Sequence, residues 1–237
     1  MKVSAAQIKV TRNPEENCEK ILLFLERAKR RKVDIICFPE TCLVTKSKDV
    51  IPVENFLKKI KEKCKTLRIY CIFGTYEKMR KSIYNIVYLV DKNGKIKYKY
   101  KKIHLWVTEK NKNVKPGKEN RVINTEFGKI GIITCWDFAF PEDIRKLSKE
   151  GARIIFCPSY LVNYRPAKDV LEYLPLVRAF ENCCYYVTAD VFTKETAEMS
   201  FICSPYKIFA KIKGREGMIS RKIDLRRIDR LRKFYDY

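Results

Sequence analysis

The sequence predicts a mixed α/β fold in which amphipathic helices cover the faces of β-sheets. Segments with helical periodicity occur in separated pairs among many segments with strand-like patterns. Each helix can bury one apolar stripe and each sheet needs covering, so a layered arrangement satisfies both. The 237-residue chain is 46 % apolar, which is enough for a sizeable core. Because no repeat, low-complexity tract or Pro/Gly-rich linker divides it, we expect residues 1–237 to form a single domain.

The first predicted elements are a strand, a helix and a second strand. Residues 2–8 alternate as a strand does. The segment "NPEE" at 13–16 is typical of a helix start, because Asn caps the N-terminus, Pro suits the first helical position and acidic residues favour the first turn. Apolar residues then recur at helical spacing, at Cys18, Ile21, Leu22, Leu25 and Ala28. The continuous apolar run "VDIICF" predicts a buried strand.

The later elements continue the alternation. A helix is expected at 51–66, a turn with the hairpin dipeptide Asn-Gly at 91–95, and a helix at 141–150 that Gly151 ends. Further strands are expected at 69–76, 83–90, 95–100, 121–126, 130–134, 153–158 and 185–190. A helix at 168–183, two or three strands in the tail to 223 and a short basic helix at 224–233 complete the chain. In such folds catalytic residues lie where strands end.

The charge balance is strongly basic. The chain has 51 basic and 28 acidic residues and a net charge of +23, which could indicate a nucleic-acid partner. The basic residues are spread from Lys9 to Lys233, and no zinc-finger, RNP1-like or basic-zipper pattern occurs. We therefore favour a solvated basic surface and keep nucleic acid as the less favoured partner.

The cysteines are expected to be reduced core residues. No C-x-x-C pair occurs and His104 is the only histidine, which disfavours a zinc site. Most of the ten cysteines lie in apolar runs, as Cys37, Cys71 and Cys157 do. No window approaches 18 consecutive apolar residues, and "MKVSAAQIKVTRN" is typical of a first strand and not of a secretory signal. We expect a cytoplasmic protein without a membrane span.

Three strand ends carry reactive groups. Glu40 follows "IICFP", Lys102 lies in "YKYKKIHLW" and Cys135 follows "GIIT". Taken singly, each has an ordinary explanation as a turn, surface or core residue. A cysteine nucleophile needs a base or a lowered pKa. Apart from His104, a carboxylate such as Glu40 is the available base, and a neighbouring lysine would stabilise thiolate and oxyanion charge.

Together these segments resemble three motifs of the nitrilase superfamily of carbon–nitrogen hydrolases, in the same order. "DIICFPET" resembles the first motif, "YKYKKIHLW" the second, and "GIITCWDFAFPEDIRKLSKEGARIIFCPS" the third. The resemblance implies a Glu-Lys-Cys triad with Glu40 as base, Lys102 (not its neighbour Lys101) as the ammonium, and Cys135 as nucleophile. Phe140, Pro141 and Glu142 then open the helix after the nucleophile and have a mainly structural role.

The resemblance extends over nearly the whole chain, through "VSAAQIKVTRNPEENCEKI", "IYNIVYLVDKNGKI", "VRAFEN" and "IDLRRIDRLR". It implies a four-layer α-β-β-α sandwich, a homodimer or larger assembly, and no metal or organic cofactor. Glu109, shortly before Pro116-Gly117, is a candidate second active-site carboxylate; a structural or solvated role is the alternative. The backbone N–H of Trp136 is implied in the oxyanion site, and its side chain either lines the pocket or packs.

The expected activity is hydrolysis of a non-peptide C–N bond through a thioester, with release of ammonia or an amine. Small amides are the first choice of substrate, N-carbamoyl compounds the second and nitriles the third. Some positions depart from the family pattern and concern a pocket wall and subunit contacts: Ala139, Asp190, Thr193, Glu198 and Lys207. The alternatives are a catalytically silent interaction subunit and a basic nucleic-acid-binding protein on the same fold.

Overall fold

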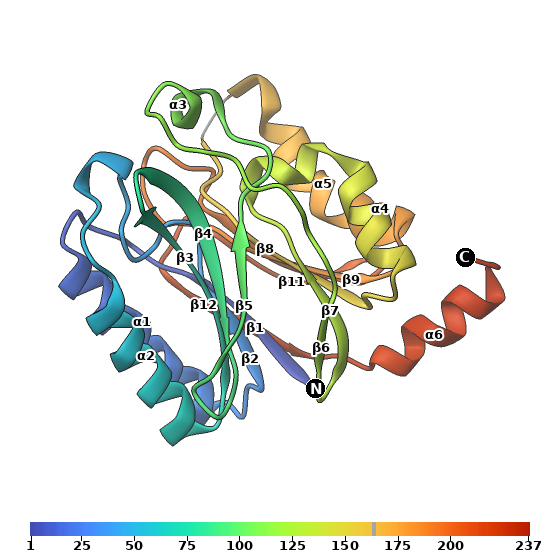
Figure 1. Cartoon of the computed structure of the whole chain (residues 1–237). Helices are drawn as coiled ribbons and strands as arrows, with labels where there is room; N and C mark the ends of the chain where they lie inside the picture. Colours follow the sequence, from blue (N-terminus) through green and yellow to red (C-terminus); the bar gives the residue numbers. More distant parts are fainter. Residues whose placement is uncertain (163–164) are drawn as a thin grey trace.

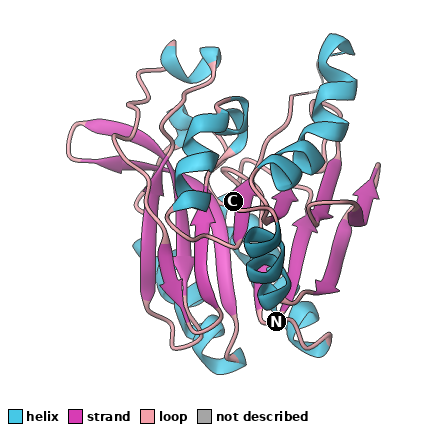
Figure 2. Ribbon diagram, turned by 90° about the vertical axis from the view of Figure 1, so that its right-hand side faces the viewer, coloured by secondary structure: helices cyan, strands magenta, loops and turns pink. Residues whose placement is uncertain are grey.

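A computed structural model describes residues 1–162 and 165–237. Two six-stranded sheets pack face to face, with helices on both outer sides. Figure 1 shows α1 and α2 against one sheet and α4 and α5 against the other; Figure 2 shows the molecule turned by 90°, with the C-terminal helix in front. The expected four-layer α-β-β-α sandwich is therefore confirmed.

The first sheet contains the N-terminal half of the chain and one late strand. Its order is β12 (Gly217–Lys222), β1 (Lys2–Gln7), β2 (Ile35–Cys37), β3 (Tyr70–Met79), β4 (Ser82–Val90) and β5 (Ile96–Lys101). Strands β1, β2 and β3 are parallel, while β3–β4 and β4–β5 are antiparallel hairpins and β12 runs antiparallel to β1. Strands β2 and β5 consequently run in the same direction, and their carboxyl ends lie at the same end of the sheet.

The second sheet contains the rest of the strands. Its order is β11 (Ile208–Lys213), β10 (Met199–Cys203), β9 (Tyr185–Ala189), β8 (Ile154–Pro158), β7 (Gly128–Ile132) and β6 (Ile123–Thr125). Strands β7, β8 and β9 are parallel, and the outer pairs are antiparallel. The tail thus supplies three strands, the upper end of the range expected from the sequence.

Six α-helices are described: α1 (Pro14–Arg30), α2 (Glu54–Leu67), α3 (Val107–Lys110), α4 (Pro141–Lys149), α5 (Lys168–Glu181) and α6 (Leu225–Phe234). The start of α1 agrees with the sequence signal, because the Asn13 side chain accepts a 2.9 Å hydrogen bond from the Glu15 N–H. Gly151 follows α4 with φ of +102°, a conformation that suits glycine. None of the helices in the described ranges combines the length and apolar character of a membrane crossing.

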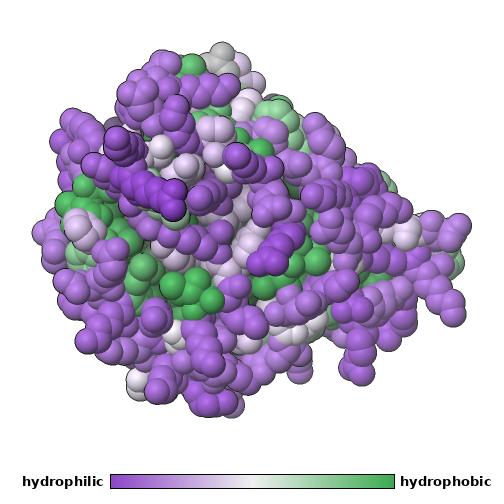
Figure 3. Space-filling model, in the orientation of Figure 1, coloured by the Kyte–Doolittle hydropathy of each residue, from purple (hydrophilic) through white to green (hydrophobic). Residues whose placement is uncertain are grey.

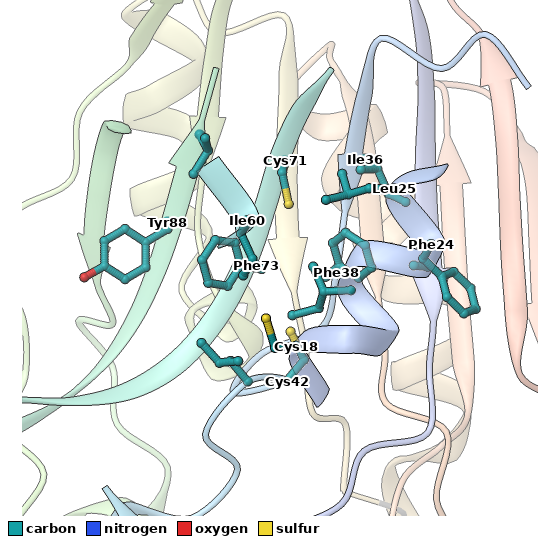
Figure 4. Packing of buried hydrophobic residues seen from close by; sticks show 14 of the residues in the cluster. Cys18, Phe24, Leu25, Ile36, Phe38, Cys42, Ile60, Cys71, Phe73 and Tyr88 are labelled. Atoms are coloured by element: carbon teal, nitrogen blue, oxygen red, sulfur yellow. The ribbon is translucent and has the colours of Figure 1, made fainter. Parts of the chain in front are cut away.

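Alternate residues of each strand build separate cores. In β4, Ile86, Tyr88 and Val90 pack toward α1 and α2, whereas Val87 and Leu89 pack between the two sheets. Figure 4 shows the first of these cores, in which the sulfur atoms of cysteines lie among apolar and aromatic side chains and Phe73 stacks on Tyr88 at 5.5 Å. Cys37, Cys71 and Cys157 are fully buried, which confirms them as core residues.

Several expected boundaries are wrong by two or more residues. Helix α2 begins at Glu54 and not at 51, because Ile51 precedes a proline and is disfavoured in a helix. Strand β3 continues to Met79 through its pairing with Ser82. Strand β7 spans Gly128–Ile132 and not 130–134, since the chain has left the sheet by Thr134. Strand β6 begins two residues later than expected, α5 ends two residues earlier, and α3 is not evident from the sequence.

Candidate active site

Side chains from both sheets meet at one end of the sandwich. Glu40 lies three residues beyond the end of β2 and Lys102 directly follows β5, both in the first sheet; Cys135 lies three residues beyond the end of β7, in the second. The Glu40 N–H donates to the Ser159 carbonyl at 3.3 Å, which joins the turn after β2 to the end of β8. The candidate site therefore depends on the docking of the two sheets.

The turn that carries Glu40 is held against β3. The Gly74 N–H donates to the Pro39 carbonyl at 3.1 Å, and the Gly74 carbonyl accepts from the Leu43 N–H at 3.1 Å. A Cβ at position 74 would lie 2.4 Å from the Thr41 nitrogen, so only glycine permits this approach. Thr41 itself has a φ of 46°, an uncommon conformation for a β-branched residue. These constraints fix the direction in which Glu40 leaves the turn.

The two neighbouring lysines diverge. The Lys102 ammonium is buried and donates to Glu40 Oε1 at 2.7 Å and to Glu109 Oε2 at 2.8 Å. The Lys101 ammonium instead lies over the Tyr84 ring, 4.4 Å from its centroid. Successive side chains at a strand end point to opposite faces, which accounts for the difference.

Glu109 reaches the same ammonium from the short helix α3. Its carboxylate also accepts hydrogen bonds from the Trp106 N–H at 2.9 Å and from the Tyr76 hydroxyl at 3.1 Å. The residue is 4 % exposed, so the solvated alternative for Glu109 is wrong. The structure thus places the candidate second carboxylate beside Glu40 and Lys102.

One contact in this group was not expected from the sequence. The Asn85 side-chain nitrogen donates to Glu40 Oε1 and to Glu109 Oε1, both at 2.7 Å. Asn85 lies opposite Tyr76 in the β3–β4 register, which brings both polar side chains to the same place. The available signal was a lone polar residue in the apolar strand "IYNIVYLV".

Cys135 is the first residue of the 3₁₀-helix Cys135–Ala139, which follows β7 in a tight turn. Its φ is 44°, a left-handed conformation that non-glycine residues adopt mainly where the surroundings impose it. The thiol donates to the Tyr160 carbonyl at 3.4 Å. Within the described ranges no hydrogen bond engages the N–H of the next residue, Trp136. This N–H is therefore available as an oxyanion donor.

Asp137 fixes the turn to the segment that carries Lys102. Its buried carboxylate accepts from the Thr134 N–H at 2.9 Å, the His104 N–H at 2.8 Å and the Tyr100 hydroxyl at 2.7 Å. Burial raises the pKa of Asp137 to about 6, although these bonds oppose the shift. The sequence motif gave Asp137 no role, since its partners become neighbours only in the folded chain.

Aromatic side chains surround this turn. Trp136 packs edge-on against Trp106, with ring centroids 4.6 Å apart, and lies 6.2 Å from Phe138. The His104 ring stacks on Phe140 at 3.5 Å, and its Nε2 lies 2.6 Å from Asp143 Oδ2. Trp136 is only partly buried, and its pocket-lining role stays a prediction. The partners of His104 favour Glu40, and not the histidine, as the base for Cys135.

The pKa values of the two carboxylates on Lys102 shift in opposite directions. Burial raises the pKa of Glu40, and the charge of Glu109 adds to this shift. Burial acts in the same direction on Glu109, but the Lys102 charge and hydrogen bonds outweigh it and lower the pKa of Glu109. Opposite shifts in neighbouring acids indicate different roles, one as proton acceptor and one as a permanent charge. For Lys102, burial is outweighed by the Glu40 charge, and its pKa is raised.

We expect iodoacetamide to alkylate Cys135 before any other cysteine. Burial and the Glu40 charge raise the pKa of Cys135, so its advantage comes from access and from the adjacent base rather than from a resting thiolate. All ten cysteines are free and described, and Cys135 alone is not buried. Peptide mapping after limited labelling checks this. Earlier labelling of Cys183 or Cys184 would contradict the assignment.

Two of the positions that depart from the family pattern, Asp190 and Glu198, are constrained in the structure. Asp190 is completely buried, and its carboxylate accepts from the N–H groups of Leu161 and Val191 at 2.9 Å. Glu198 has a φ of 53°, where glycine is preferred. Within residues 1–162 and 165–237, no group of three or more His, Cys, Asp or Glu side chains is arranged to hold a metal ion.

Solved structures share this architecture. Nit3 from Saccharomyces cerevisiae, a member of the nitrilase superfamily, superposes with a TM-score of 0.90 at 21 % identity, over 99 % of this chain and 93 % of that one. A carbon–nitrogen hydrolase from Helicobacter pylori superposes with a TM-score of 0.91 at 19 % identity, over 100 % and 93 %. The fold is that of the nitrilase superfamily.

The sequence comparison agrees. The model of the carbon–nitrogen hydrolase family matches residues 2–233. The chain belongs to this family. It is 36 % identical to a probable nitrilase from Schizosaccharomyces pombe over 69 % of this chain and 62 % of that protein. It is 26 % identical to the 2-oxoglutaramate amidase of Bacillus subtilis over 90 % and 86 %, and 26 % identical to the omega-amidase NIT2 of Xenopus tropicalis over 98 % and 91 %.

Proposed function

We propose that this protein is an amidase-type carbon–nitrogen hydrolase that uses Cys135 as nucleophile, Glu40 as base and Lys102 as electrostatic stabiliser. The observation that carries the proposal is the buried cluster at the strand ends, in which one ammonium is shared by two carboxylates beside a strained cysteine turn. Such a preorganised charge arrangement in a site that excludes water is typical of catalysis and destabilising elsewhere.

The first half of the reaction forms a thioester. Glu40 accepts the Cys135 proton as the sulfur attacks the amide carbon, and the carbonyl oxygen becomes an oxyanion. The Trp136 N–H and the Lys102 ammonium stabilise this charge; one preorganised donor contributes about 3–4 kcal/mol to the transition state. Glu40 then returns the proton to the nitrogen, the C–N bond breaks and ammonia or an amine leaves.

The second half releases the acid. Glu40 takes a proton from water as the water oxygen attacks the thioester carbon, and the same donors stabilise the second oxyanion. The C–S bond breaks, and the sulfur regains a proton from Glu40. The covalent route divides one difficult step into two easier ones. Glu109 remains ionised throughout and holds the Lys102 ammonium in place. These steps employ side chains and backbone groups of the chain itself, without a metal or organic cofactor.

The substrate class is a small amide. The relatives include proteins named 2-oxoglutaramate amidase, deaminated glutathione amidase and omega-amidase, and these names support an amide substrate. Amides of small carboxylic acids are our first choice, N-carbamoyl compounds the second and nitriles the third. We propose that residues 1–237 work as one domain. We also propose the cytoplasm as its location, because ten free cysteines suit a reducing compartment.

A panel of amides, N-carbamoyl compounds and nitriles tests the proposed function. We expect ammonia release from at least one amide of a small carboxylic acid, with slower release from the other two classes. Iodoacetamide-treated protein serves as the blank, because alkylation of Cys135 removes the nucleophile. If no compound of the panel gives ammonia release above this blank, the hydrolase proposal fails. The alternative of a catalytically silent interaction subunit is then favoured.

The basic surface supports a second candidate function. A groove of about 670 Å³ beside β5 is lined by Lys97, Lys99, Lys101, Lys118 and Arg121 with the single acid Glu119, and Figure 3 shows that the face seen in that view is largely hydrophilic. Lys99 already pairs with Glu77 at 2.6 Å, and Arg121 lies over the Tyr98 ring. A single-stranded nucleic acid would bind here with steep salt dependence. Salt-independent or absent binding of an oligonucleotide rules this candidate out.

We further propose that the protein is a homodimer or a larger homo-oligomer that buries the outer face of α5. Val170, Tyr173, Val177 and Phe180 are all exposed, at a 3-4-3 spacing that places them on one side of the helix. The Phe180 ring packs edge-on against the Tyr206 ring, with centroids 6.5 Å apart. The Tyr206 hydroxyl in turn lies 2.9 Å from that of Tyr235. A contiguous exposed apolar patch of this kind is typical of an association surface.

Val177→Glu should shift the protein toward the monomer, because a carboxylate in the middle of this patch would have to lose its hydration on association. Size-exclusion chromatography with light scattering gives the mass. Leu23→Glu on α1 is the matched control, since Leu23 is similarly exposed on the other outer layer and should leave the mass unchanged. Equal masses for wild type and Val177→Glu would place any interface elsewhere.

A further inference from the structure

One buried amide joins the two carboxylates of the candidate site. Asn85 is 1 % exposed, and its Nδ2 donates to Glu40 Oε1 and to Glu109 Oε1 at 2.7 Å each. Lys102 Nζ bridges the same two side chains at 2.7 and 2.8 Å. The four side chains form a closed ring of hydrogen bonds, in which each carboxylate receives one bond from the ammonium and one from the amide.

The bonds leave one oxygen of Glu40 for proton transfer. Both donors reach Oε1, and among the described residues no hydrogen bond of another side chain or backbone group to Oε2 is found. After burial, the Glu40 charge is the next cause that raises the pKa of the Cys135 thiol, so the thiol and this carboxylate are neighbours. Glu109, in contrast, uses both oxygens, because Tyr76 and Trp106 also donate to it. Glu109 is therefore an anchor, and Glu40 is tied to it at one oxygen only.

The orientation of the Asn85 amide follows from its neighbours. The reverse orientation would place Oδ1 against two carboxylate oxygens and leave the NH₂ group without these acceptors. In the orientation that satisfies the acids, Oδ1 is buried and has no partner within the described part of the chain. An unpaired buried acceptor is destabilising, and such groups are uncommon in folded proteins. The unpaired Oδ1 is the consequence of an orientation in which both N–H bonds go to the carboxylates.

Building on the proposed function, we propose that Asn85 is a positioning residue that ties Glu40 to Glu109 and so holds Glu40 Oε2 toward the Cys135 thiol. It acts through Glu40 and not on the substrate. Its two hydrogen bonds also favour the ionised form of each acid, because an N–H donor stabilises a carboxylate more than a carboxylic acid. Loss of the amide should therefore misplace the base and make it harder to ionise.

The pH dependence of Cys135 alkylation tests this without knowledge of the substrate. Iodoacetamide is the probe, and the second-order rate constant is measured from acidic to neutral pH for wild type and Asn85→Ala. In wild type the rate should rise with pH as Glu40 ionises. In Asn85→Ala this rise should move to higher pH by about one unit, and the rate at neutral pH should fall about tenfold or more because the base is misplaced.

Asn120→Ala is the matched control. Asn120 is also a buried asparagine, and its Nδ2 donates to the Ile132 carbonyl at 2.6 Å, outside the cluster. Its loss should leave the position of the alkylation rise unchanged, even where stability falls. Asn85→Ser retains one donor and should lie between wild type and Asn85→Ala. If Asn85→Ala does not fold, the pH dependence of alkylation is measured on Asn85→Ser instead.

The outcomes separate this inference from the proposed function. A rise at the wild-type pH in both Asn85 variants overturns the positioning role, as does an equal shift in Asn120→Ala. Where an amide substrate is found, kcat should fall about 10²-fold with KM changed by only a few-fold in Asn85→Ala; a change confined to KM would assign Asn85 to substrate binding instead. If alkylation shifts as expected but wild type releases no ammonia from the panel, the proposed hydrolysis fails while the role of Asn85 stands.

Discussion

Cys135→Ala should lose at least about 10⁴-fold in kcat, because no other group can form the thioester and the oxyanion donors alone supply only a small part of the rate. Alanine is smaller than cysteine and fits the site without clash. It would adopt the same left-handed backbone conformation as the cysteine, with φ of 44°. Ammonia release, measured per folded protein, gives the effect. Mass spectrometry of wild type during turnover should detect the acyl group on the peptide that contains Cys135.

A buried cysteine provides the control. Cys71 lies in the core between the first sheet and its helices and is completely buried. Cys71→Ala should lower the melting temperature by leaving a small cavity, yet it should retain a kcat within a few-fold of wild type. If Cys135→Ala keeps more than about a tenth of the wild-type rate, a covalent mechanism through this residue is wrong.

The second large effect is expected for Lys102→Met. The substitution removes the ammonium that stabilises the oxyanion, which should lower kcat by about 10²–10³-fold or more. It also leaves Glu40 and Glu109 as two buried carboxylates without their shared cation, so one of them should take up a proton. Breaking a buried ion pair destabilises a protein by about 3–5 kcal/mol, and thermal melts must therefore accompany the kinetics.

The neighbouring lysine makes the comparison specific. Lys101 has the same charge but lies over the Tyr84 ring, so Lys101→Met should remain within a few-fold of wild type. Lys102→Arg should restore little activity, because a planar guanidinium does not fit a site built around a compact ammonium. An inactive Lys101→Met beside an active Lys102→Met would show that the motif alignment is displaced by one residue. Two active variants would remove lysine from the mechanism.

Much of the fold was predictable because its signals are local. The caps at Asn13 and Gly151, the Asn-Gly turn and the alternation of apolar residues each act over a few residues, and the structure confirms them. The four layers came from resemblance instead, and the order of the strands was not predicted, since pairing between distant segments leaves no local pattern. Some misplaced boundaries lie where tertiary pairing extends an element, as at the end of β3.

The candidate site divides in the same way. Glu40, Lys102 and Cys135 stand out in sequence because reactive groups follow strands, and the folded chain places the first two in direct contact. Asn85 and Asp137 do not stand out. Asn85 lies within an apolar strand, and its importance depends on a cross-strand neighbour and on two acids from other segments. A buried polar residue in a strand is visible in a sequence, but its partners are not.

The place of β12 at the edge of the first sheet bears on how the chain is made. A ribosome produces β1 long before its antiparallel partner β12, with Gln7 opposite Gly217. At about 5–20 residues per second, β1 waits roughly 10–40 s for that neighbour. During this interval one edge of the nascent sheet has unpaired N–H and C=O groups, which favour pairing with other chains. Stalled or truncated synthesis before residue 217 would therefore produce a chain whose first strand is prone to aggregation, although all proposed catalytic residues had been made.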